Sequence, residues 1–200
     1  VGLPLSLAFS KKYKVVGFDI KEERINQLNL FDDITNEIDT EELRDKLDKS
    51  LVVTSKVSDL RDCNIFIVTV PTPVTSEKKP DLSFLLKATE MVSKMIKKED
   101  IIIFESTVYP GCTEEECVPI LEKNSKLVYN KDFFCGYSPE RINPGDKINT
   151  IDKIVKVTSG SNAKSAQIID NLYSSIISAG TFKASSIKVA EASKAIENAQ

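Results

Sequence analysis

Short apolar runs alternate along the chain with amphipathic stretches. The two clearest runs are residues 64–70 and 101–104. Continuous apolar runs of this length are typical of parallel strands that are covered on both faces. The other predicted strands are 14–19, 51–54, 133–137, 154–157 and 181–183.

Helical spacing of apolar residues separates these strands. In 22–30, for example, Ile25 and Leu28 lie three residues apart. The predicted helices are 1–10, 22–30, 41–49, 85–97, an acidic helix that begins at Thr113, 163–177 and 186–200. Strands that alternate with helices of this length indicate right-handed βαβ units. The pattern therefore predicts an α/β fold with a Rossmann-like, doubly wound parallel sheet.

Composition narrows the class of protein. The chain has 200 residues, of which 41% are hydrophobic and 28% charged, as in ordinary globular proteins. No apolar run approaches the roughly 20 residues that a membrane helix needs. The net charge is −3, and lysines are scattered rather than gathered in a basic stripe. We therefore expect neither a membrane nor a nucleic acid as partner.

Cysteine and histidine limit the possible chemistry. The spacing of Cys63, Cys112, Cys117 and Cys135 matches no zinc site, and the chain has no histidine. We expect reduced, mostly buried thiols, no bound metal and a cytoplasmic location. Catalysis must then depend on carboxylate, lysine, thiol or hydroxyl groups, or on a cofactor.

Polar motifs follow three of the predicted strands. In open α/β sheets, ligands bind at the carboxyl ends of the strands. Ordinary turns are the alternative explanation of each motif, because Pro and Ser are common turn residues. The candidate cofactor contacts at these strand ends are Val70, Pro71, Thr72, Ser106 and Thr107. The candidate catalytic residues there are Thr107 and Glu140.

The first 19 residues contain a possible dinucleotide signature. Gly2 opens a helix, and Asp19 ends the strand that follows. In dinucleotide folds, a helix N-terminus after a glycine loop binds the pyrophosphate, and an acidic residue binds the adenosine ribose. A loop glycine and a surface aspartate remain the alternative.

The last predicted helix presents Lys194 and Asn198 four residues apart, so they share a face. A lysine beside a carboxamide can stabilise an oxyanion. The alternative is a solvated helix face on which Glu191 and Lys194 form an ion pair.

Several segments of the chain are long and unusual. These segments are VGLPLSLAFS, VVGFDIKEERINQL, FIVTVPTPV, FESTVYPGCTEEECVPILE, YSPERINPGD, KIVKVTSG and KVAEASKAIENAQ. In these segments the chain resembles the UDP-glucose/GDP-mannose dehydrogenase family. The YSPERINPGD loop is more similar to the branch that oxidises UDP-N-acetylhexosamines. In the UDP-glucose branch we would expect an acidic residue near Pro144.

The resemblance implies a two-step, NAD-dependent oxidation of a sugar C6 alcohol to a carboxylate, for surface polysaccharide precursors. Gly2 and Asp19 would bind the cofactor, and Thr72 and Thr107 would line the cofactor and a catalytic water. Glu140 would act as acid/base with that water, and Lys194 and Asn198 would steady an oxyanion. The implied partners are a UDP-sugar and a second copy of the chain, as a homodimer.

The resemblance also implies that parts of the machinery lie outside the chain. The first strand of the sheet would precede Val1, and the nucleophilic cysteine would follow Gln200 in a motif that this sequence lacks. We therefore expect 1–183 to form the NAD-binding domain, 184–200 to begin a central linking helix, and the fragment alone to be inactive.

Two other functions remain open: a non-catalytic dinucleotide-binding module, and a hydroxyacid or 6-phosphogluconate-type dehydrogenase. As cofactor, NAD is favoured over NADP because the Asp19 carboxylate would repel a 2′-phosphate. Lys21 and Arg24 act against this preference, since either side chain could bind the 2′-phosphate of NADP. Arg24 is also a candidate cofactor contact.

Overall fold

The computed structural model describes residues 2–35, 37–74, 77, 80–141 and 151–197. The chain divides into two compact units. The first unit combines Val1–Cys63 with Ile142–Ile154, and the second combines Asn64–Arg141 with Val155–Gln200.

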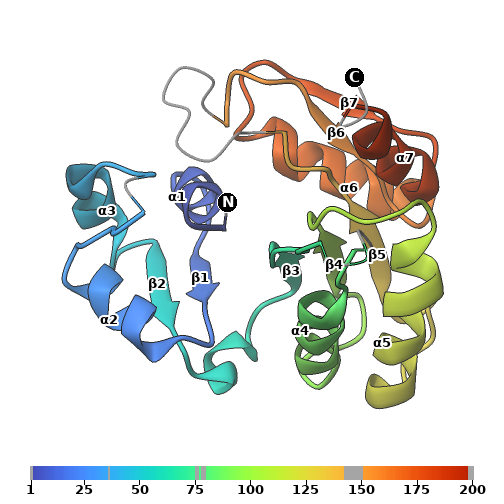
Figure 1. The fold of residues 1–200 in the computed structure, drawn as a ribbon, viewed down its shortest axis with the longest axis horizontal. Helices are drawn as coiled ribbons and strands as arrows, with labels where there is room; N and C mark the ends of the chain where they lie inside the picture. The colour runs from blue at the N-terminus through green and yellow to red at the C-terminus, as the bar shows by residue number, and fades with distance from the viewer. Residues whose placement is uncertain (1, 36, 75–76, 78–79, 142–150, 198–200) are drawn as a thin grey trace. The chain divides into compact units, whose positions relative to one another are not determined.

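The first unit is a small parallel α/β layer (Figure 1). Its elements are α1 (Gly2–Ser10), β1 (Val15–Phe18), α2 (Glu22–Asn29), α3 (Thr40–Lys46), β2 (Leu51–Thr54) and the 3-10 helix η1 (Val57–Leu60). Strands β1 and β2 run parallel, with Val15 opposite Leu51. Helix α1 packs on β1 and on α3, and α2 packs on β2.

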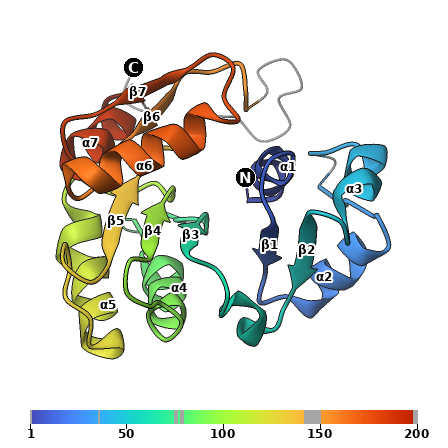
Figure 2. The ribbon, with the colours of Figure 1, turned by 180° about the vertical axis from the view of Figure 1, so that it is seen from behind.

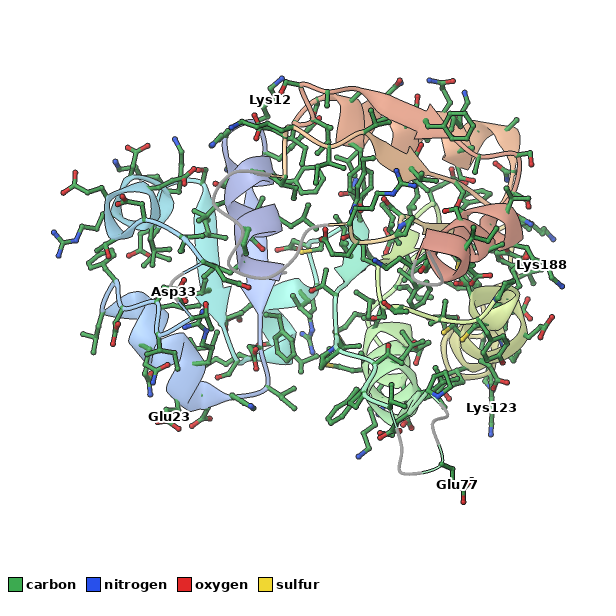
Figure 3. All side chains as sticks on the ribbon, turned by 45° about the horizontal axis from the view of Figure 1, so that its top comes forward. Lys12, Glu23, Asp33, Glu77, Lys123 and Lys188 are labelled. Carbon is green, nitrogen blue, oxygen red and sulfur yellow. The ribbon has the colours of Figure 1, made fainter. Side chains whose placement is uncertain are left out.

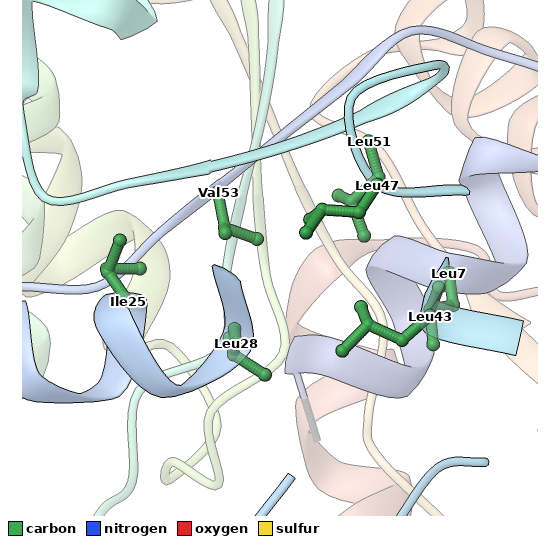
Figure 4. Close-up of a cluster of buried hydrophobic side chains, with 7 residues drawn as sticks. All are labelled: Leu7, Ile25, Leu28, Leu43, Leu47, Leu51 and Val53. Atoms are coloured by element: carbon green, nitrogen blue, oxygen red, sulfur yellow. The ribbon is translucent and has the colours of Figure 1, made fainter. Parts of the chain in front are cut away.

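Seven buried apolar side chains from the three helices, β2 and the turn before it hold this unit together (Figure 4). Leu43 of α3 and Leu51 of β2 are fully buried. Burial of such side chains is the main favourable term in folding. The cluster consists of Leu7, Ile25, Leu28, Leu43, Leu47, Leu51 and Val53.

The second unit is larger and contains two groups of strands. Its elements are β3 (Ile65–Val68), α4 (Ser83–Ser93), β4 (Ile101–Phe104), the π-helix η2 (Thr113–Cys117), α5 (Val118–Ser125), β5 (Phe134–Tyr137), β6 (Lys156–Thr158), α6 (Ala163–Ser174), β7 (Thr181–Lys183) and α7 (Ile187–Glu197). Strands β3, β4 and β5 are paired in that order, and β6 pairs with β7. Every one of these pairs is parallel.

Helices cover this sheet as the apolar runs predicted. All four residues of β4, the middle strand, are buried. Helices α4 and α5 lie side by side (Figures 1 and 2). Helix α6 packs on β5, β6 and β7, and α7 contacts β5. The predicted class of fold, a parallel Rossmann-like α/β sheet, is confirmed.

Element boundaries show where sequence patterns were less reliable. The strand predicted at 154–157 is Lys156–Thr158, and the helix predicted at 85–97 is Ser83–Ser93. The acidic helix begins with a π-helical turn, Thr113–Cys117, before α5. The 3-10 helix η1 was not predicted. The predicted boundary between 183 and 184 falls just before α7, and whether it separates two domains stays a prediction.

Candidate functional site

Gly2 lies in the first turn of helix α1, which comprises Gly2–Ser10. The Ser6 hydroxyl donates a hydrogen bond of 2.8 Å to the Gly2 carbonyl one turn earlier. The N-terminal N–H groups of a helix have no partner within the helix, and they carry a partial positive charge. The N-terminus of α1 is therefore suited to a phosphate group.

Asp19 follows β1 directly and is half-buried. Its Oδ1 accepts a hydrogen bond of 2.9 Å from the Lys21 N–H, which fixes the side chain at the start of α2. Among the described residues, its Oδ2 makes no hydrogen bond. An oriented carboxylate with one open oxygen at a strand end can accept hydrogen bonds from a diol such as ribose.

Arg24 has a protein partner. Its Nη2 lies 2.5 Å from Oδ1 of Asp33, and the arginine side chain is only 16% exposed. Asp33 also accepts bonds from the Thr35 side chain and from the backbone of Glu37. Burial by itself would raise the pKa of Asp33, but the hydrogen bonds from Thr35 and Arg24 outweigh it and lower the pKa. This ion pair orders the loop after α2 (Asp33 is labelled in Figure 3), and a cofactor role for Arg24 stays a prediction.

Two strand ends in the second unit are joined by a side chain. The buried Ser106 hydroxyl donates a hydrogen bond of 2.6 Å to the Val70 carbonyl. The Ser106 carbonyl in turn accepts a bond of 3.1 Å from the Tyr137 hydroxyl. The structure thus brings together the motifs that follow β3 and β4, and it gives Ser106 a structural role there.

The two threonine candidates at these strand ends differ. The Thr72 Oγ1 is buried and has no hydrogen-bond partner among the described residues. Such groups are rare in proteins because leaving one unpaired costs about 1–3 kcal/mol. The side chain of Thr107 is exposed, and Pro71 before Thr72 is exposed as well. A ligand that accepts or donates a hydrogen bond would satisfy Thr72.

Glu140 lies in the segment after β5 and is half-buried. Its Oε1 accepts a hydrogen bond of 2.8 Å from the Arg141 N–H. The same segment is bonded to the strand region 155–157 on both sides of Glu140. Ser138 Oγ donates to the Val157 carbonyl at 2.7 Å, and Arg141 Nη1 donates to the Val155 carbonyl at 3.3 Å.

A buried ion pair lies beside these residues, and sequence reasoning missed it. The Lys156 ammonium is 3.1 Å from Oε2 of Glu105, and the two side chains are 5% and 0% exposed. The Tyr173 hydroxyl donates to the other oxygen of Glu105. Burial raises the pKa of Glu105, the nearby Lys156 opposes this rise, and the charge of Glu140 adds to it. Lys156 and Tyr173 lie 51 and 68 positions from Glu105 in the sequence, so no local pattern predicted that these side chains meet.

Glu191 has a role that differs from the exposed ion pair considered above. It is fully buried, and its carboxylate accepts bonds from the Gly111 N–H at 2.5 Å and the Thr113 N–H at 2.9 Å. Burial raises its pKa, and the bonds from Thr113 and Gly111 counteract the rise. The ion-pair interpretation is therefore wrong for Glu191, which caps the N-terminus of η2 from another helix.

Helix α7 carries the last two candidates. Lys194 lies one turn after Glu191 and is half-buried. Lys188 on the same helix extends outward (Figure 3) and has a side chain that is 61% exposed. Asn198 lies outside the described residues. Docking through Glu191 therefore fixes the helix that carries Lys194 against the turn after β4.

Three further features concern the cysteines, possible metal sites and the length of the helices. All four cysteines are free thiols, and Cys112, Cys117 and Cys135 are buried as predicted. In the described part of the chain, no group of cysteine and acidic residues could hold a metal ion. None of the described helices is long and apolar enough to cross a membrane.

The chain is similar to known nucleotide-sugar dehydrogenases over its whole length. It is 58% identical over 200 residues to the UDP-N-acetyl-D-glucosamine 6-dehydrogenase of Pseudomonas aeruginosa and 54% identical to that of Salmonella typhi. These alignments cover 100% of this chain and 47% of each relative, so the chain spans about half of their length. A solved structure of UDP-D-ManNAc dehydrogenase from Pyrococcus horikoshii matches with a TM-score of 0.91 at 34% identity, over 99% of this chain and 47% of that one.

A family model makes the assignment. The model of the NAD-binding domain of the UDP-glucose/GDP-mannose dehydrogenase family matches residues 1–177. This match covers well over half of the chain, and it includes the candidate residues from Gly2 to Glu140. The cofactor of such a domain is NAD, as the sequence predicted. The chain therefore belongs to the UDP-glucose/GDP-mannose dehydrogenase family and forms its NAD-binding domain.

Proposed function

We propose that the protein containing this chain is an NAD-dependent UDP-N-acetylhexosamine 6-dehydrogenase, and that UDP-N-acetyl-D-glucosamine is its first candidate substrate. The observation that carries the proposal is the difference in identity between relatives. Identity is 58% and 54% with two enzymes named for the glucosamine substrate, but 34% with the UDP-N-acetyl-D-mannosamine dehydrogenase of Pyrococcus horikoshii.

The proposed reaction converts the C6 alcohol of the sugar to a carboxylate. One alcohol, one water and two NAD+ yield one carboxylate, two NADH and three protons. NAD supplies the hydride acceptor at each step. The protein must therefore orient the C6 carbon, admit one water and move protons at two stages.

The first unit supplies proposed contacts to the adenosine side of NAD. The N-terminus of α1 at Gly2 would bind phosphate. Asp19 would accept hydrogen bonds from the ribose through Oδ2, which makes none among the described residues. Both features fit the cofactor because a helix N-terminus offers N–H donors to a phosphate and the Asp19 carboxylate offers an acceptor to ribose hydroxyls.

The second unit supplies the remaining proposed contacts. Thr72 is the best supported of them, because its buried Oγ1 has no hydrogen-bond partner in the part of the chain that the structure describes. Val70 and Pro71 would present backbone beside the cofactor, and Ser106 would hold the end of β4 in place. Thr107, whose side chain is exposed, would bind the water that enters the reaction.

Glu140 would act as the acid/base for that water, and Lys194 and Asn198 would stabilise the oxyanion. We further propose that 184–200 begins a linking helix, and that the complete protein is a cytoplasmic homodimer that makes precursors of surface polysaccharides. The UDP-sugar would bind mainly through parts of the protein outside this chain.

Absorbance at 340 nm tests the proposal. The full-length protein should produce two NADH per UDP-N-acetyl-D-glucosamine. Glu140→Gln should lower kcat by about 100-fold or more, since general acid–base catalysis contributes about 10²–10⁴ in rate. Glu99→Gln is the matched control, because Glu99 forms a solvent-exposed ion pair with Lys164. An inactive full-length protein, with any UDP-N-acetylhexosamine, would contradict the proposal, as would full activity of Glu140→Gln.

A further inference from the structure

The buried ammonium of Lys156 has more than one partner. Its Nζ lies 3.1 Å from Oε2 of Glu105 and 3.2 Å from the backbone carbonyl of Pro139. It also lies 5.5 Å from the centre of the Tyr173 ring, within the range of a cation–π interaction. One cation therefore connects β6, the end of β4, α6 and the segment that carries Glu140.

The hydrogen bond from Lys156 to the Pro139 carbonyl bears on catalysis, because it acts next to Glu140. Pro139 directly precedes Glu140, and a proline has no N–H with which to fix its own position in the sheet. Its carbonyl is held by Lys156, while its neighbours Ser138 and Arg141 are bonded to the Val157 and Val155 carbonyls. Residues 155–157 thus bind the segment on both sides of Glu140, through the Pro139 carbonyl and the side chains of Ser138 and Arg141.

Stability alone does not account for this arrangement. A buried ion pair contributes little net stability, because removing two charges from water costs about as much as their attraction returns. The hydrogen bonds that Glu105 accepts from Lys156 and from the Tyr173 hydroxyl offset only part of this desolvation cost. Apolar side chains of similar size would fill the same space at no loss of stability.

We propose that Lys156 is a positioning residue for Glu140, and that Glu105 and Tyr173 hold the Lys156 ammonium where it can bind the Pro139 carbonyl. This inference rests on the proposed function, since it assigns Glu140 the acid/base role. Small displacements of a catalytic group are costly, and an error of about 1 Å can reduce a rate about 100-fold. Lys156 would act through the backbone, without touching substrate or cofactor.

The test uses three variants of the full-length protein. Lys156→Met alone leaves the Glu105 charge buried without the ammonium, which by itself destabilises the fold. The informative variant is the double substitution Glu105→Gln with Lys156→Met, which removes both charges and keeps the side-chain volumes. Lys164→Met is the matched control, because it removes a lysine from an exposed ion pair with Glu99.

Two measurements on the double variant decide the proposal. We expect kcat with UDP-N-acetyl-D-glucosamine to fall about 10- to 100-fold, while the KM for NAD+ and the thermal midpoint stay near the wild-type values. We also expect faster amide hydrogen exchange in the peptide that covers 138–141. A merely structural pair predicts the opposite, since wild-type kcat would return once both charges are gone.

The outcomes separate this inference from the proposed function. Wild-type kcat in the double variant overturns the positioning role, whatever the exchange shows. If the wild-type protein oxidises no UDP-N-acetylhexosamine, the proposed function fails, and the exchange data alone then decide whether Lys156 holds the segment. Unchanged exchange at 138–141 overturns the inference in either case.

Discussion

Single side chains connect distant parts of the second unit, and Glu191 is the clearest example. The first N–H groups of a helix need partners, which usually come from a residue just before the helix. Here the partner is a carboxylate from α7, which binds the N–H groups of Gly111 and Thr113. One buried acidic residue therefore joins the turn after β4 to the helix that carries Lys194.

Replacing Glu191 by alanine should release both amides. Hydrogen bonds to a charged group contribute about 1.5–3 kcal/mol each, and the two N–H groups would stay buried without a partner. We expect the free energy of local opening to fall by about 3 kcal/mol. This change corresponds to roughly 150-fold faster hydrogen exchange of the Gly111 and Thr113 amides. Exchange is measured by mass spectrometry or NMR on the full-length protein.

Lys188→Ala on the same helix is the control for this prediction. Lys188 lies 3.7 Å from Glu115, and both side chains are about 60% exposed. Exposed pairs of this kind contribute about 0–1 kcal/mol. If Lys188→Ala had the same effect as Glu191→Ala, the carboxylate cap would not be the cause.

At the scale of elements, close packing of α6 on β5 depends on Gly136. A Cβ added to this residue would lie 2.3 Å from the Ile169 Cδ1 and 2.6 Å from the Ser159 carbonyl oxygen. Ile169 belongs to α6, and Ser159 follows β6. A glycine in β5 therefore lets a helix and the neighbouring backbone approach the strand together.

Gly136→Ala should destabilise the protein because neither neighbour can move freely. Ile169 is fully buried, and the Ser159 carbonyl is part of the backbone. Overpacking of this kind costs about 1–3 kcal/mol, which should appear as a lower thermal midpoint of the full-length protein. Gly17→Ala in β1 is the control, since its nearest new contact would be an ordinary 3.4 Å from Val53 Cγ1. An equal loss in both variants would exclude the steric explanation.

For the molecule as a whole, the sequence predicted what depends on local pattern. Apolar runs predicted β2 and β4 at their observed bounds, and the short strand β7 was also predicted at its bounds. The polar motifs predicted after β3 and β4 are joined by the bond from Ser106 to Val70. The prediction is clearest for β4, because a strand that is buried on both faces is apolar at every residue.

Long-range charge pairing could not be predicted in the same way. Glu105 was not among the candidate residues, and Lys156 lies inside a strand predicted at 154–157, where no pattern indicated that its side chain is buried. Their partnership depends on how β4, β6 and α6 pack, and no spacing rule connects positions 51 residues apart. The ion-pair alternative for Glu191 was wrong for the same reason, because the partners of Glu191 lie in another element.

We expect the two units of the chain to serve different functions, one in cofactor binding and the other in catalysis. Asp19 belongs to the first unit and is proposed to bind the adenosine ribose, whereas Glu140 belongs to the second and is proposed to act on water. Asp19→Asn should therefore raise the KM for NAD+ about 10-fold or more and leave kcat nearly unchanged, because a charged acceptor is lost from binding alone. Glu140→Gln should have the reverse effect, with a lower kcat and an unchanged KM for NAD+.

Steady-state kinetics of the full-length protein with both cofactors check this division. Asp32→Asn is the matched control, since Asp32 is an exposed aspartate of the same unit. The Asp19 carboxylate would repel a 2′-phosphate, so the wild-type protein should have a lower KM for NAD+ than for NADP+. Asp19→Asn should bring these two KM values closer together. Tighter binding of NADP+ by the wild-type protein would contradict the role of Asp19, because the nearby positive charges of Lys21 and Arg24 would then determine cofactor choice.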